Sequence, residues 1–480
     1  MKTKGQMLPT AKVRLVLLVA GFYLFRERPS GRKTLSSIAV LPLENLSGDA
    51  AQEWFSDGMT ESLIAELSKI KALIVISRTS VMRFKKTRKP LKEIARELDV
   101  EAVVEGSALL VKDRVRITAQ LIEASTDRHL WAESYERDLR DVLSLQQQVA
   151  QAIAREIQVT LTPQEQTRLA SARPVNPEVY TLCTKGVYYM RQFTQEALQK
   201  AFAYLNQAIR MDPSFAPAYA ALADAHVIAA DWYMPSIEAG PKAKALASKA
   251  VEIDEAASEG HWALAWVHMF YDWDWAGAER EFKLAIQLNP GDVTSHSGYG
   301  WYLLVVKRFD ESLTEAKRAQ ELDPLSPLTN TNLGMGLHYA RQYDRAIEQL
   351  RMAIELDPSS FWAHAHLGMA YEQKGELDKA IGEFRRAREL NDIPWTRAYL
   401  GHARALAGDR VEALRVVAGL KEDSKRLVVA PYDVALVYAG LGDKDQALAW
   451  LEKAYQARSW FMAWVQVDPR LDGLRSDPRF

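Results

Sequence analysis

The sequence predicts a multidomain chain of class α+β/α, in which a small βαβαβββα domain precedes an all-α repeat solenoid. Short apolar segments alternate with helical stripes over residues 37–160, which is typical of a compact α/β domain. Further along, prolines recur every 34 residues, which indicates stacked helix pairs. The charge is balanced, with 61 Lys and Arg against 62 Asp and Glu, whereas a nucleic-acid-binding surface normally brings a basic excess. The composition therefore does not indicate a nucleic-acid partner.

The first 36 residues combine basic charges with one apolar run. Arg14 and Arg26 enclose eleven uncharged residues, LVLLVAGFYLF. This length suits the core of a signal segment better than a full membrane span of roughly 20 residues, and no small-residue cleavage motif follows. We therefore expect residues 1–36 to form an uncleaved N-terminal signal anchor with a basic flank. The alternative is a buried helix or an amphipathic stub, and basic residues on both flanks leave the orientation open.

The domain over residues 37–160 begins with two buried strands and a helix. The runs SIAVLP (37–42) and ALIVIS (72–77) are apolar almost throughout, as expected of strands that are covered on both faces. Between them, Phe55, Met59 and Leu63 recur every four residues and predict one helical stripe.

A strand meander and a closing helix follow. Pro90 opens a short helix, because proline is tolerated at the first helical position. The runs EAVVEGSALL and RVRITAQLIEA flank a turn at residues 111–113, and RHLWAESYE supplies a third strand. Apolar residues spaced between Val142 and Ile157 mark the closing helix, which completes the order βαβαβββα.

Four phrases in this region carry a resemblance: SIAVLPLENLSGD, EWFSDGMTESLIAELSKI, ELDVEAVVEGSALL and RVRITAQLIEASTDRHLWAESYERDL. Residues 37–160 thereby resemble the TolB-type amino-terminal α/β domain of bacterial adenylate-cyclase-like and CadC-like sensor and regulator proteins. In those relatives a winged-helix or cyclase output module commonly precedes the membrane segment. Only about 14 residues precede the apolar run here, so we expect the output domain to be absent from this chain. The resemblance also implies a bacterial inner-membrane location, with the bulk of the chain in the periplasm.

The helical region beyond this domain repeats with a fixed period. Pro290, Pro324 and Pro358 lie 34 residues apart and close the similar phrases FKLAIQLNP, AKRAQELDP and LRMAIELDP. Glycines at 300, 334 and 368 keep the same spacing. This period, with small residues where two helices cross and proline after the second helix, is the tetratricopeptide signature. We expect about eight repeats over residues 178–458.

The repeat array has a linker before it and a cap after it. The polar, proline-bearing stretch TPQEQTRLASARPVNP predicts a linker over residues 161–177. Residues 459–480 are expected to form a C-terminal cap. The phrases YDWDWAGAEREFKLAIQLNP and LDGLRSDPRF extend the resemblance to the repeat array of the same sensor proteins.

Motifs for catalysis are missing from the sequence. It holds no G-x-x-x-x-G-K-[ST] phosphate loop, no H-E-x-x-H pair and no G-x-S-x-G elbow. His364 and His366 are two residues apart and fall on different sides of a helix, whereas His261 and His268 share a face. Histidines that pack between repeats are the favoured interpretation, and a metal site at His261 and His268 is the alternative. We expect no enzyme activity, no cofactor and no metal.

Two further features have simple interpretations. Asp57, followed by a glycine, resembles a family hallmark, and we interpret it as a helix-start or turn residue rather than a catalytic one. The run RFKKTRK (83–89) holds five positive charges and is interpreted as a solvated loop. Contact with lipid headgroups, or with nucleic acid over a short patch, is the alternative.

The repeat register predicts a partner groove. The first helix of each tetratricopeptide pair lines the concave face, and here that face lacks lysine and arginine. Aromatic and methionine side chains suit adaptable contact with an apolar or extended peptide. The alternative is that these side chains fill the interior of the superhelix, or pack on the α/β domain, and bind no ligand. The residues expected there are Trp262, Trp266, Met269, Phe270, Trp301, Asn332, Met335, His338, Trp362, His366, Met369 and Glu372.

The sequence thus predicts a membrane-tethered, non-catalytic scaffold. Its repeats would bind a protein or peptide in a bacterial envelope or signalling assembly. The alternative is a sensory subunit of a transcriptional or adenylate-cyclase-type regulator whose output domain lies on another chain.

Overall fold

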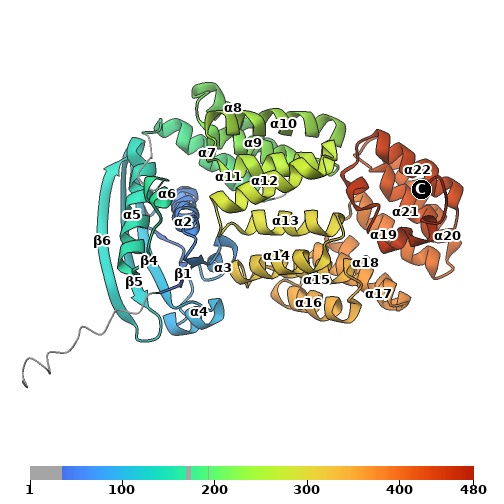
Figure 1. Ribbon diagram of the computed structural model, residues 1–480, viewed down its shortest axis with the longest axis horizontal. Coiled ribbons are helices and arrows are strands. Elements are labelled where there is room, and N and C mark those ends of the chain that lie inside the picture. Colours follow the sequence, from blue (N-terminus) through green and yellow to red (C-terminus); the bar gives the residue numbers. More distant parts are fainter. Residues whose placement is uncertain (1–34, 169–173, 193) are drawn as a thin grey trace, which may run out of the picture.

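The computed structural model describes residues 35–168, 174–192 and 194–480. A small sheet-containing domain lies at one end of the molecule, and a curved stack of helix pairs extends from it (Figure 1). This arrangement confirms the coarse prediction of an α/β domain followed by an all-helical solenoid.

The sheet has the strand order β3-β1-β4-β5-β6. The short strand β2 lies outside this order and pairs in parallel with β4. β1 pairs in parallel with β3 and β4, while β4, β5 and β6 form an antiparallel meander. The strands are β1 (Ser37–Val40), β2 (Glu44–Asn45), β3 (Ile74–Val75), β4 (Ala102–Val111), β5 (Arg114–Glu123) and β6 (Arg128–Asp138).

β1 is buried along its whole length, so both faces of the sheet are covered there, whereas the meander of β4, β5 and β6 has one face under helices and one polar face. Alternation in β5 buries Val115 and Ile117 under the helices, whereas Arg116 is exposed and pairs with Glu136 of β6. The predicted order of elements recurs, with β2 and α3 as short additions. The helices are α2 (Glu53–Ser68), α3 (Arg78–Met82), α4 (Leu91–Leu98) and α5 (Val142–Glu156).

The helical region of the described chain contains eight consecutive pairs. The prolines that define the period lie two residues after the ends of α12, α14 and α16, because proline cannot continue the helical hydrogen-bond ladder. The pairs are α7 (Pro177–Met190) with α8 (Gln195–Met211), α9 (Ala216–Ala229) with α10 (Ser236–Ile253), α11 (Ser258–Val267) with α12 (Trp275–Leu288), α13 (Val293–Val305) with α14 (Phe309–Leu322), α15 (Pro327–Tyr339) with α16 (Tyr343–Leu356), α17 (Phe361–Gln373) with α18 (Leu377–Leu390), α19 (Pro394–Leu406) with α20 (Arg410–Asp423), and α21 (Pro431–Gly440) with α22 (Lys444–Gln456).

The periodic glycines allow two of the helix crossings to be close. A Cβ atom on Gly334 would lie 2.6 Å from the Leu350 side chain, and one on Gly368 would lie 2.7 Å from Phe384. Gly300 has the same repeat position but more space, since its nearest neighbour would be 3.5 Å away. The reason is that Ala316 stands where the later repeats carry leucine or phenylalanine.

The segment expected to be a linker contains a short helix, α6 (Pro163–Arg168). Thr162 and Glu165 cap its start reciprocally: the Thr162 N–H donates to the Glu165 carboxylate at 2.7 Å, and the Glu165 N–H donates to the Thr162 hydroxyl at 3.2 Å. Glu165 also accepts from the Lys71 N–H at 2.9 Å, which ties this segment to the sheet domain.

Hydrogen bonds connect the sheet domain to the third and fourth helix pairs. The Ser77 N–H donates to the Leu322 carbonyl at 2.8 Å, and the Gly291 N–H donates to the Ser68 carbonyl at 3.0 Å. The Ser68 hydroxyl also lies 2.9 Å from Asn289 Oδ1.

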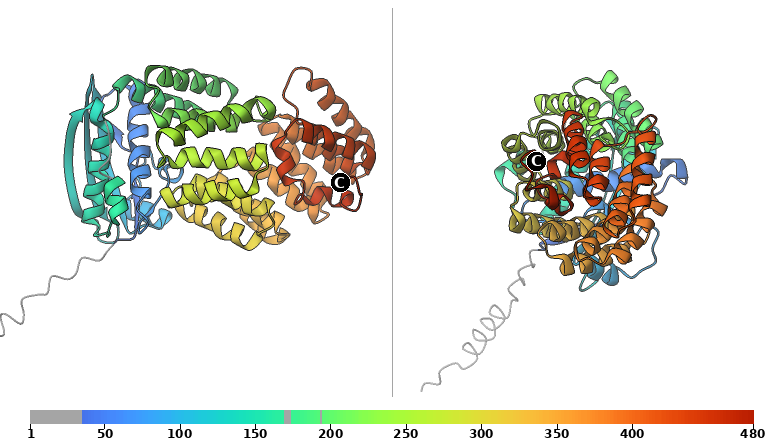
Figure 2. Two further views of the ribbon diagram at one scale, coloured as in Figure 1. Left: turned by 45° about the horizontal axis from the view of Figure 1, so that its top comes forward. Right: turned by 90° about the vertical axis from the view of Figure 1, so that its right-hand side faces the viewer.

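The C-terminal residues turn back into the curve of the stack. They form two 3₁₀ helices, η4 (Trp460–Trp464) and η5 (Pro469–Leu474). In the end-on view of Figure 2 the helix pairs curve around a centre, and the last segments of the chain, in dark red, lie inside the curve.

The predicted inner-membrane location with a periplasmic bulk requires correction. Within the ranges that the structure describes, no helix combines the length and the apolarity needed to cross a bilayer. Helices of the described chain either have a polar face or are buried between repeats. Neither kind is the uniformly apolar helix that a bilayer requires. The expected anchor in residues 1–36 falls almost wholly outside the described residues.

Candidate protein-binding surfaces

The twelve residues of the predicted groove come from the first helices of four successive pairs, α11, α13, α15 and α17, and from the π-helical turn η3 (His268–Asp272). Trp266, Trp301 and Trp362 are partly buried, and the other nine residues are buried. A first helix places every third or fourth side chain on the inner side, which is why residues from several repeats meet there.

Aromatic rings connect these helices across the inner face. Trp266 stacks on Phe270 with ring centroids 4.6 Å apart and lies 5.4 Å from Trp301. Trp301 stacks on Trp362 at 6.4 Å, and Trp362 meets the His366 ring edge-on at 4.6 Å. The structure therefore brings the predicted tryptophans of three repeats into one cluster.

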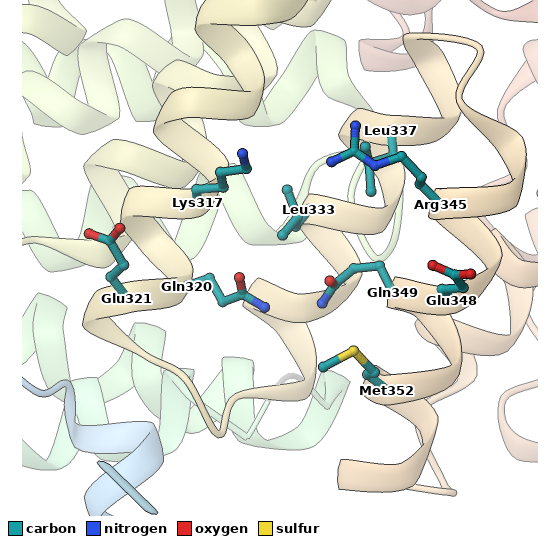
Figure 3. A pocket seen from close by; sticks show the side chains of 9 residues that line it. All are labelled: Lys317, Gln320, Glu321, Leu333, Leu337, Arg345, Glu348, Gln349 and Met352. Carbon is teal, nitrogen blue, oxygen red and sulfur yellow. The ribbon is translucent and has the colours of Figure 1, made fainter. Parts of the chain in front are cut away.

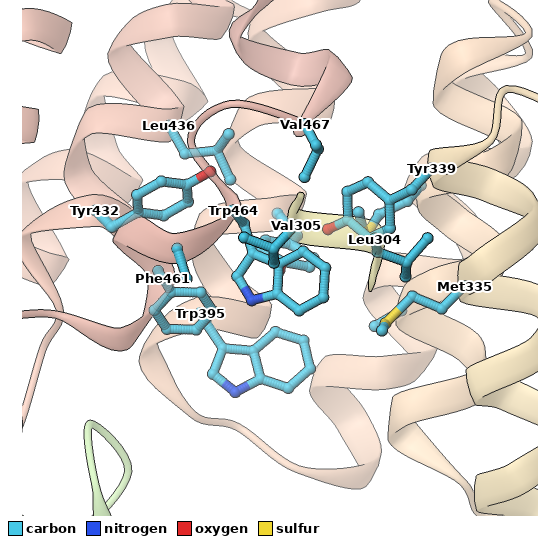
Figure 4. Close-up of a cluster of buried hydrophobic side chains, with 14 of the residues drawn as sticks. Leu304, Val305, Met335, Tyr339, Trp395, Tyr432, Leu436, Phe461, Trp464 and Val467 are labelled. Carbon is cyan, nitrogen blue, oxygen red and sulfur yellow. The ribbon is translucent and has the colours of Figure 1, made fainter. Parts of the chain in front are cut away.

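The C-terminal segment, residues 459–480, covers this cluster. Trp460 of η4 lies 5.1 Å from Phe270, and Trp464 lies 5.7 Å from Trp301 and stacks on Tyr339 at 5.0 Å. Figure 4 shows Trp464 among side chains from both sides of the curve. A partner would therefore reach the predicted groove only after the C-terminal segment had moved.

A buried ion pair lies in the middle of this segment. Arg470 and Asp468 contact each other at 2.7 Å, and both are buried. Tyr432 donates to Asp468 at 2.8 Å, and the Arg470 guanidinium lies 4.1 Å from the centre of the Tyr399 ring. Burial alone would raise the pKa of Asp468, but the guanidinium of Arg470 holds it well below its ordinary value. Asp468 is therefore a carboxylate that anchors the segment.

Two buried histidines, His338 and His366, lie on the inner face. Among the described residues, none pairs with either ring nitrogen of His338 or His366. Burial lowers the pKa of each to about 3, so both rings are neutral at pH 7. His366 borders a small cavity of about 20 Å³, which is the space left between the inner face and the C-terminal segment.

The remaining predicted residues are integrated into the interior. Glu372 lies 2.9 Å from the Nδ1 atom of His402. Met335 and Met369 are fully or almost fully buried, and no described residue pairs with the Oδ1 atom of Asn332.

Three other histidines, His261, His296 and His364, each pair with a glutamate of the following helix. His296 contacts Glu315 at 2.6 Å through Nδ1, and its Nε2 lies 3.0 Å from the Pro290 carbonyl. His364 repeats this geometry with Glu383 and Pro358, and His261 does so with Glu281 and the Glu255 carbonyl. These side chains hold the first helix of a pair against the second helix and the preceding turn. Within the described part of the chain, no cluster of three or more potential ligands is arranged to hold a metal ion.

The charge run at residues 83–89 is partly used within the sheet domain. Lys85 contacts Asp57 and Glu53, each at 2.6 Å, and Asp57 is buried. These contacts join the run to helix α2.

A second surface, which the sequence interpretation missed, lies on the outer side of the stack. It is a groove with a volume of about 420 Å³ between α14 and α16, above α15 (Figure 3). Met352, which lines this groove, is 50% exposed. The sequence signal for this surface is a pair of amides, Asn330 and Gln349, at repeat positions that hold histidine and glutamate in the neighbouring repeats. The lining residues are Lys317, Gln320, Glu321, Leu333, Leu337, Arg345, Glu348, Gln349 and Met352.

Family models match the repeat region. A TPR repeat model matches residues 337–375, and a tetratricopeptide repeat model matches residues 363–392 and 432–459. The C-terminal region therefore contains tetratricopeptide repeats, which confirms the interpretation of the 34-residue spacing. The TolB-type resemblance of residues 37–160 stays a prediction.

Among curated proteins, the chain is similar to "Putative adenylate cyclase 3" of Rhizobium meliloti (strain 1021). The two are 36% identical over 244 residues, which make up 50% of this chain and 41% of that protein. The match thus spans about two fifths of the relative's length.

One similar solved structure is YrrB, described as a TPR protein with an unusual peptide-binding site. It is 21% identical with a TM-score of 0.28, and the match covers 39% of this chain and 92% of that one. PilF of Pseudomonas aeruginosa is 20% identical with a TM-score of 0.34, covering 44% of this chain and 92% of that one. PilW, a type IV pilus biogenesis factor, is 17% identical with a TM-score of 0.37, covering 46% of this chain and 97% of that one.

Proposed function

We propose that this chain is a non-catalytic scaffold whose tetratricopeptide repeats bind a protein or peptide partner in a bacterial signalling assembly. Tetratricopeptide repeats imply protein–protein interaction, because stacked helix pairs offer an extended curved surface to a partner. Proteins of this fold are typically non-catalytic, and the sequence carries no phosphate loop, zinc-protease motif or nucleophile elbow.

The observation that carries the proposal is the polypeptide segment on the inner face. Trp460 and Trp464 lie against Phe270, Trp301 and Tyr339, so this face accepts aromatic side chains from a segment of its own chain. Buried aromatic anchors are also what protein partners most often supply. We therefore propose that the twelve inner-face residues form a partner groove, which a segment with aromatic side chains enters when residues 459–480 leave it.

Capture followed by titration tests this proposal. The tagged full chain is expressed in its native host, and each captured protein is identified by mass spectrometry, purified and titrated against the full chain by calorimetry. We expect at least one captured protein to bind saturably. If no captured protein binds the purified chain, the scaffold proposal is overturned.

A variant of the covering segment tests the inner groove separately. Trp464→Ala loosens residues 459–480, so a partner that enters the inner groove should bind this variant more tightly than the wild type. Trp275→Ala is the control, because Trp275 is 37% exposed at the start of α12. Equal affinity for the wild type and both variants would exclude the inner groove and leave the scaffold function standing.

The second candidate function is a sensory subunit of an adenylate-cyclase-type or transcriptional regulator. It is favoured by the 36% identity to a protein named as a putative adenylate cyclase, of which 41% is matched. Under this proposal the captured partner carries a cyclase or winged-helix domain, and adding the full chain changes that partner's cyclase rate or promoter binding. A partner without such a domain, bound saturably, would exclude this candidate.

A further inference from the structure

The outer groove is lined by a polar side chain at a repeat position where the neighbouring repeats carry apolar ones. Gln320 of α14 has the repeat position of Ile286 and Ile354, which lie 34 residues before and after it. Both isoleucines pack against the apolar core. Gln320, by contrast, lines a groove of about 420 Å³.

The same repeat also has amides where its neighbours have a histidine–glutamate pair. Asn330 stands at the repeat position of His296, and Gln349 stands at the position of Glu315. The histidine–glutamate pair that joins the two helices of each neighbouring repeat is therefore absent here. A cluster of three amides, Gln320, Asn330 and Gln349, takes its place, and its two glutamines line the groove.

Hydrogen bonds fix the orientation of the three amide groups. Gln320 and Gln349 each donate from Nε2 to the Oδ1 atom of Asn330, at 2.7 and 2.8 Å. Asn330 in turn donates from Nδ2 to the carbonyls of Pro324 and Ser326, at 3.0 and 2.8 Å. The two glutamines reach toward each other from opposite sides of the groove (Figure 3). Within the described residues no hydrogen bond occupies their side-chain carbonyl oxygens, so these acceptors and the second N–H groups can pair with a peptide backbone, which needs both acceptors and donors.

An apolar strip adjoins the amides. Leu333 and Leu337 of α15 form the floor of the groove and are buried, while Met352 of α16 is 50% exposed at its rim. Methionine adapts its shape to different apolar contacts, and it is over-used at binding surfaces for this reason.

The charged side chains around the groove are segregated, with basic residues toward one end and acidic residues toward the other. Lys317 and Arg345 extend toward each other from α14 and α16 near Leu337 (Figure 3). Glu321 and Glu348 lie about one helical turn further along the same two helices. Lys317 and Glu348 form no ion pair with any residue in the described ranges, so their charges are available to a partner.

We propose that this outer groove binds an extended segment of a partner polypeptide. An acidic side chain of the segment lies between Lys317 and Arg345, an apolar side chain contacts Leu333 and Met352, and the backbone pairs with the glutamine amides. Because Glu348 repels a second acid, the segment carries its acidic residue at one end only. This inference rests on the proposed function and names the chemistry of one partner segment.

Selection of phage-displayed random peptides on the full chain tests the inference. Enriched peptides should carry an acidic residue near an apolar one, and the K317E/R345E double variant should bind them about tenfold more weakly. Exchanging the peptide's acidic residue for lysine should restore binding to the double variant. Arg385→Glu is the matched control, because Arg385 is exposed and has the repeat position of Lys317 two repeats later.

The outcomes separate the groove from the wider function. Three outcomes would overturn the proposal for the outer groove. They are enriched peptides without an acidic residue, no enrichment at all, and equal binding of the peptides to the wild type and the double variant. A captured protein that binds saturably, and binds the double variant equally well, would overturn the groove while supporting the scaffold. Thermal melting of each variant checks folding, and these exposed charges should leave the midpoint unchanged.

Discussion

The Ser80 hydroxyl donates to the Asp323 carboxylate at 2.6 Å, and both residues are buried between the sheet domain and the fourth helix pair. The Ser80 N–H donates to the same oxygen at 3.0 Å. Burial raises the pKa of Asp323 even though several donors favour its ionised form. This contact joins helix α3 of the small domain to the turn between two repeats.

Removing that carboxylate should destabilise the whole chain. We expect Asp323→Ala to lower the free energy of unfolding by about 1–3 kcal/mol, because it leaves buried donors of Ser80 without an acceptor. The control is Asp357→Ala, one repeat later, where the carboxylate bonds only the local turn at Ser359. Equal losses for the two variants in denaturant titrations would contradict an interdomain role for Asp323.

Acid should weaken the fold through the inner-face histidines. The pKa of His338 and His366 is about 3 in the folded chain, against roughly 6.5 in an unfolded one. Between these values the unfolded chain binds more protons, so stability falls as the pH is lowered from about 6.5 toward 3. The loss approaches about 1.4 kcal/mol per pH unit for each histidine.

The H338L/H366L double variant measures this contribution. It removes two buried imidazoles that have no partner among the described residues, so its stability should depend less steeply on pH than that of the wild type. The difference between the two curves isolates the histidines, because the groups that face them, Asp468, Arg470 and Arg341, are present in both. Parallel curves would show that these rings are not buried as described.

His261 should behave in the opposite way. Burial, the largest single influence, lowers its pKa, but the hydrogen bonds to Glu281 and to the Glu255 carbonyl, together with the nearby negative charges, outweigh burial and leave the pKa raised. The stabilisation is therefore fully present below the unfolded pKa of about 6.5 and is lost as the pH rises through the folded value. At pH 6 we expect His261→Leu to cost about 2–4 kcal/mol, because it leaves the buried Glu281 without this partner. A neutral effect in chemical unfolding at that pH would contradict the pairing.

The C-terminal segment should contribute strongly to stability. Trp464→Ala removes a ring that stacks on Tyr339, and the loss should be about 3–5 kcal/mol. Trp275→Ala, at a site that is 37% exposed, should cost much less. If the two substitutions shift the melting midpoint equally, residues 459–480 do not cover the inner face.

Local patterns in the sequence predicted much of this fold. The prolines at 290, 324 and 358 located the repeats, because helix ends and close crossings depend on residues a few positions apart. The same logic holds for Thr162 and Glu165, whose spacing is that of a capping box and was overlooked inside the expected linker.

Local sequence patterns could not predict that the C-terminal segment covers the inner face. Trp464 and Trp301 are far apart in the sequence, and nothing in the period reveals that the chain returns into its own curve. The outer groove, by contrast, left a signal: Asn330 and Gln349 replace a histidine–glutamate pair at one repeat only among the three that share the 34-residue register at these positions. A comparison of repeats position by position would have found it.

Hydrogen–deuterium exchange of the full chain, with and without the purified captured partner, tests the central claim most directly. The account predicts that the partner slows amide exchange within the repeats, in α11–α17 for the inner groove or in α14–α16 for the outer one. Protection confined to the sheet domain, with the repeats unchanged, would contradict the claim that the tetratricopeptide repeats hold the partner.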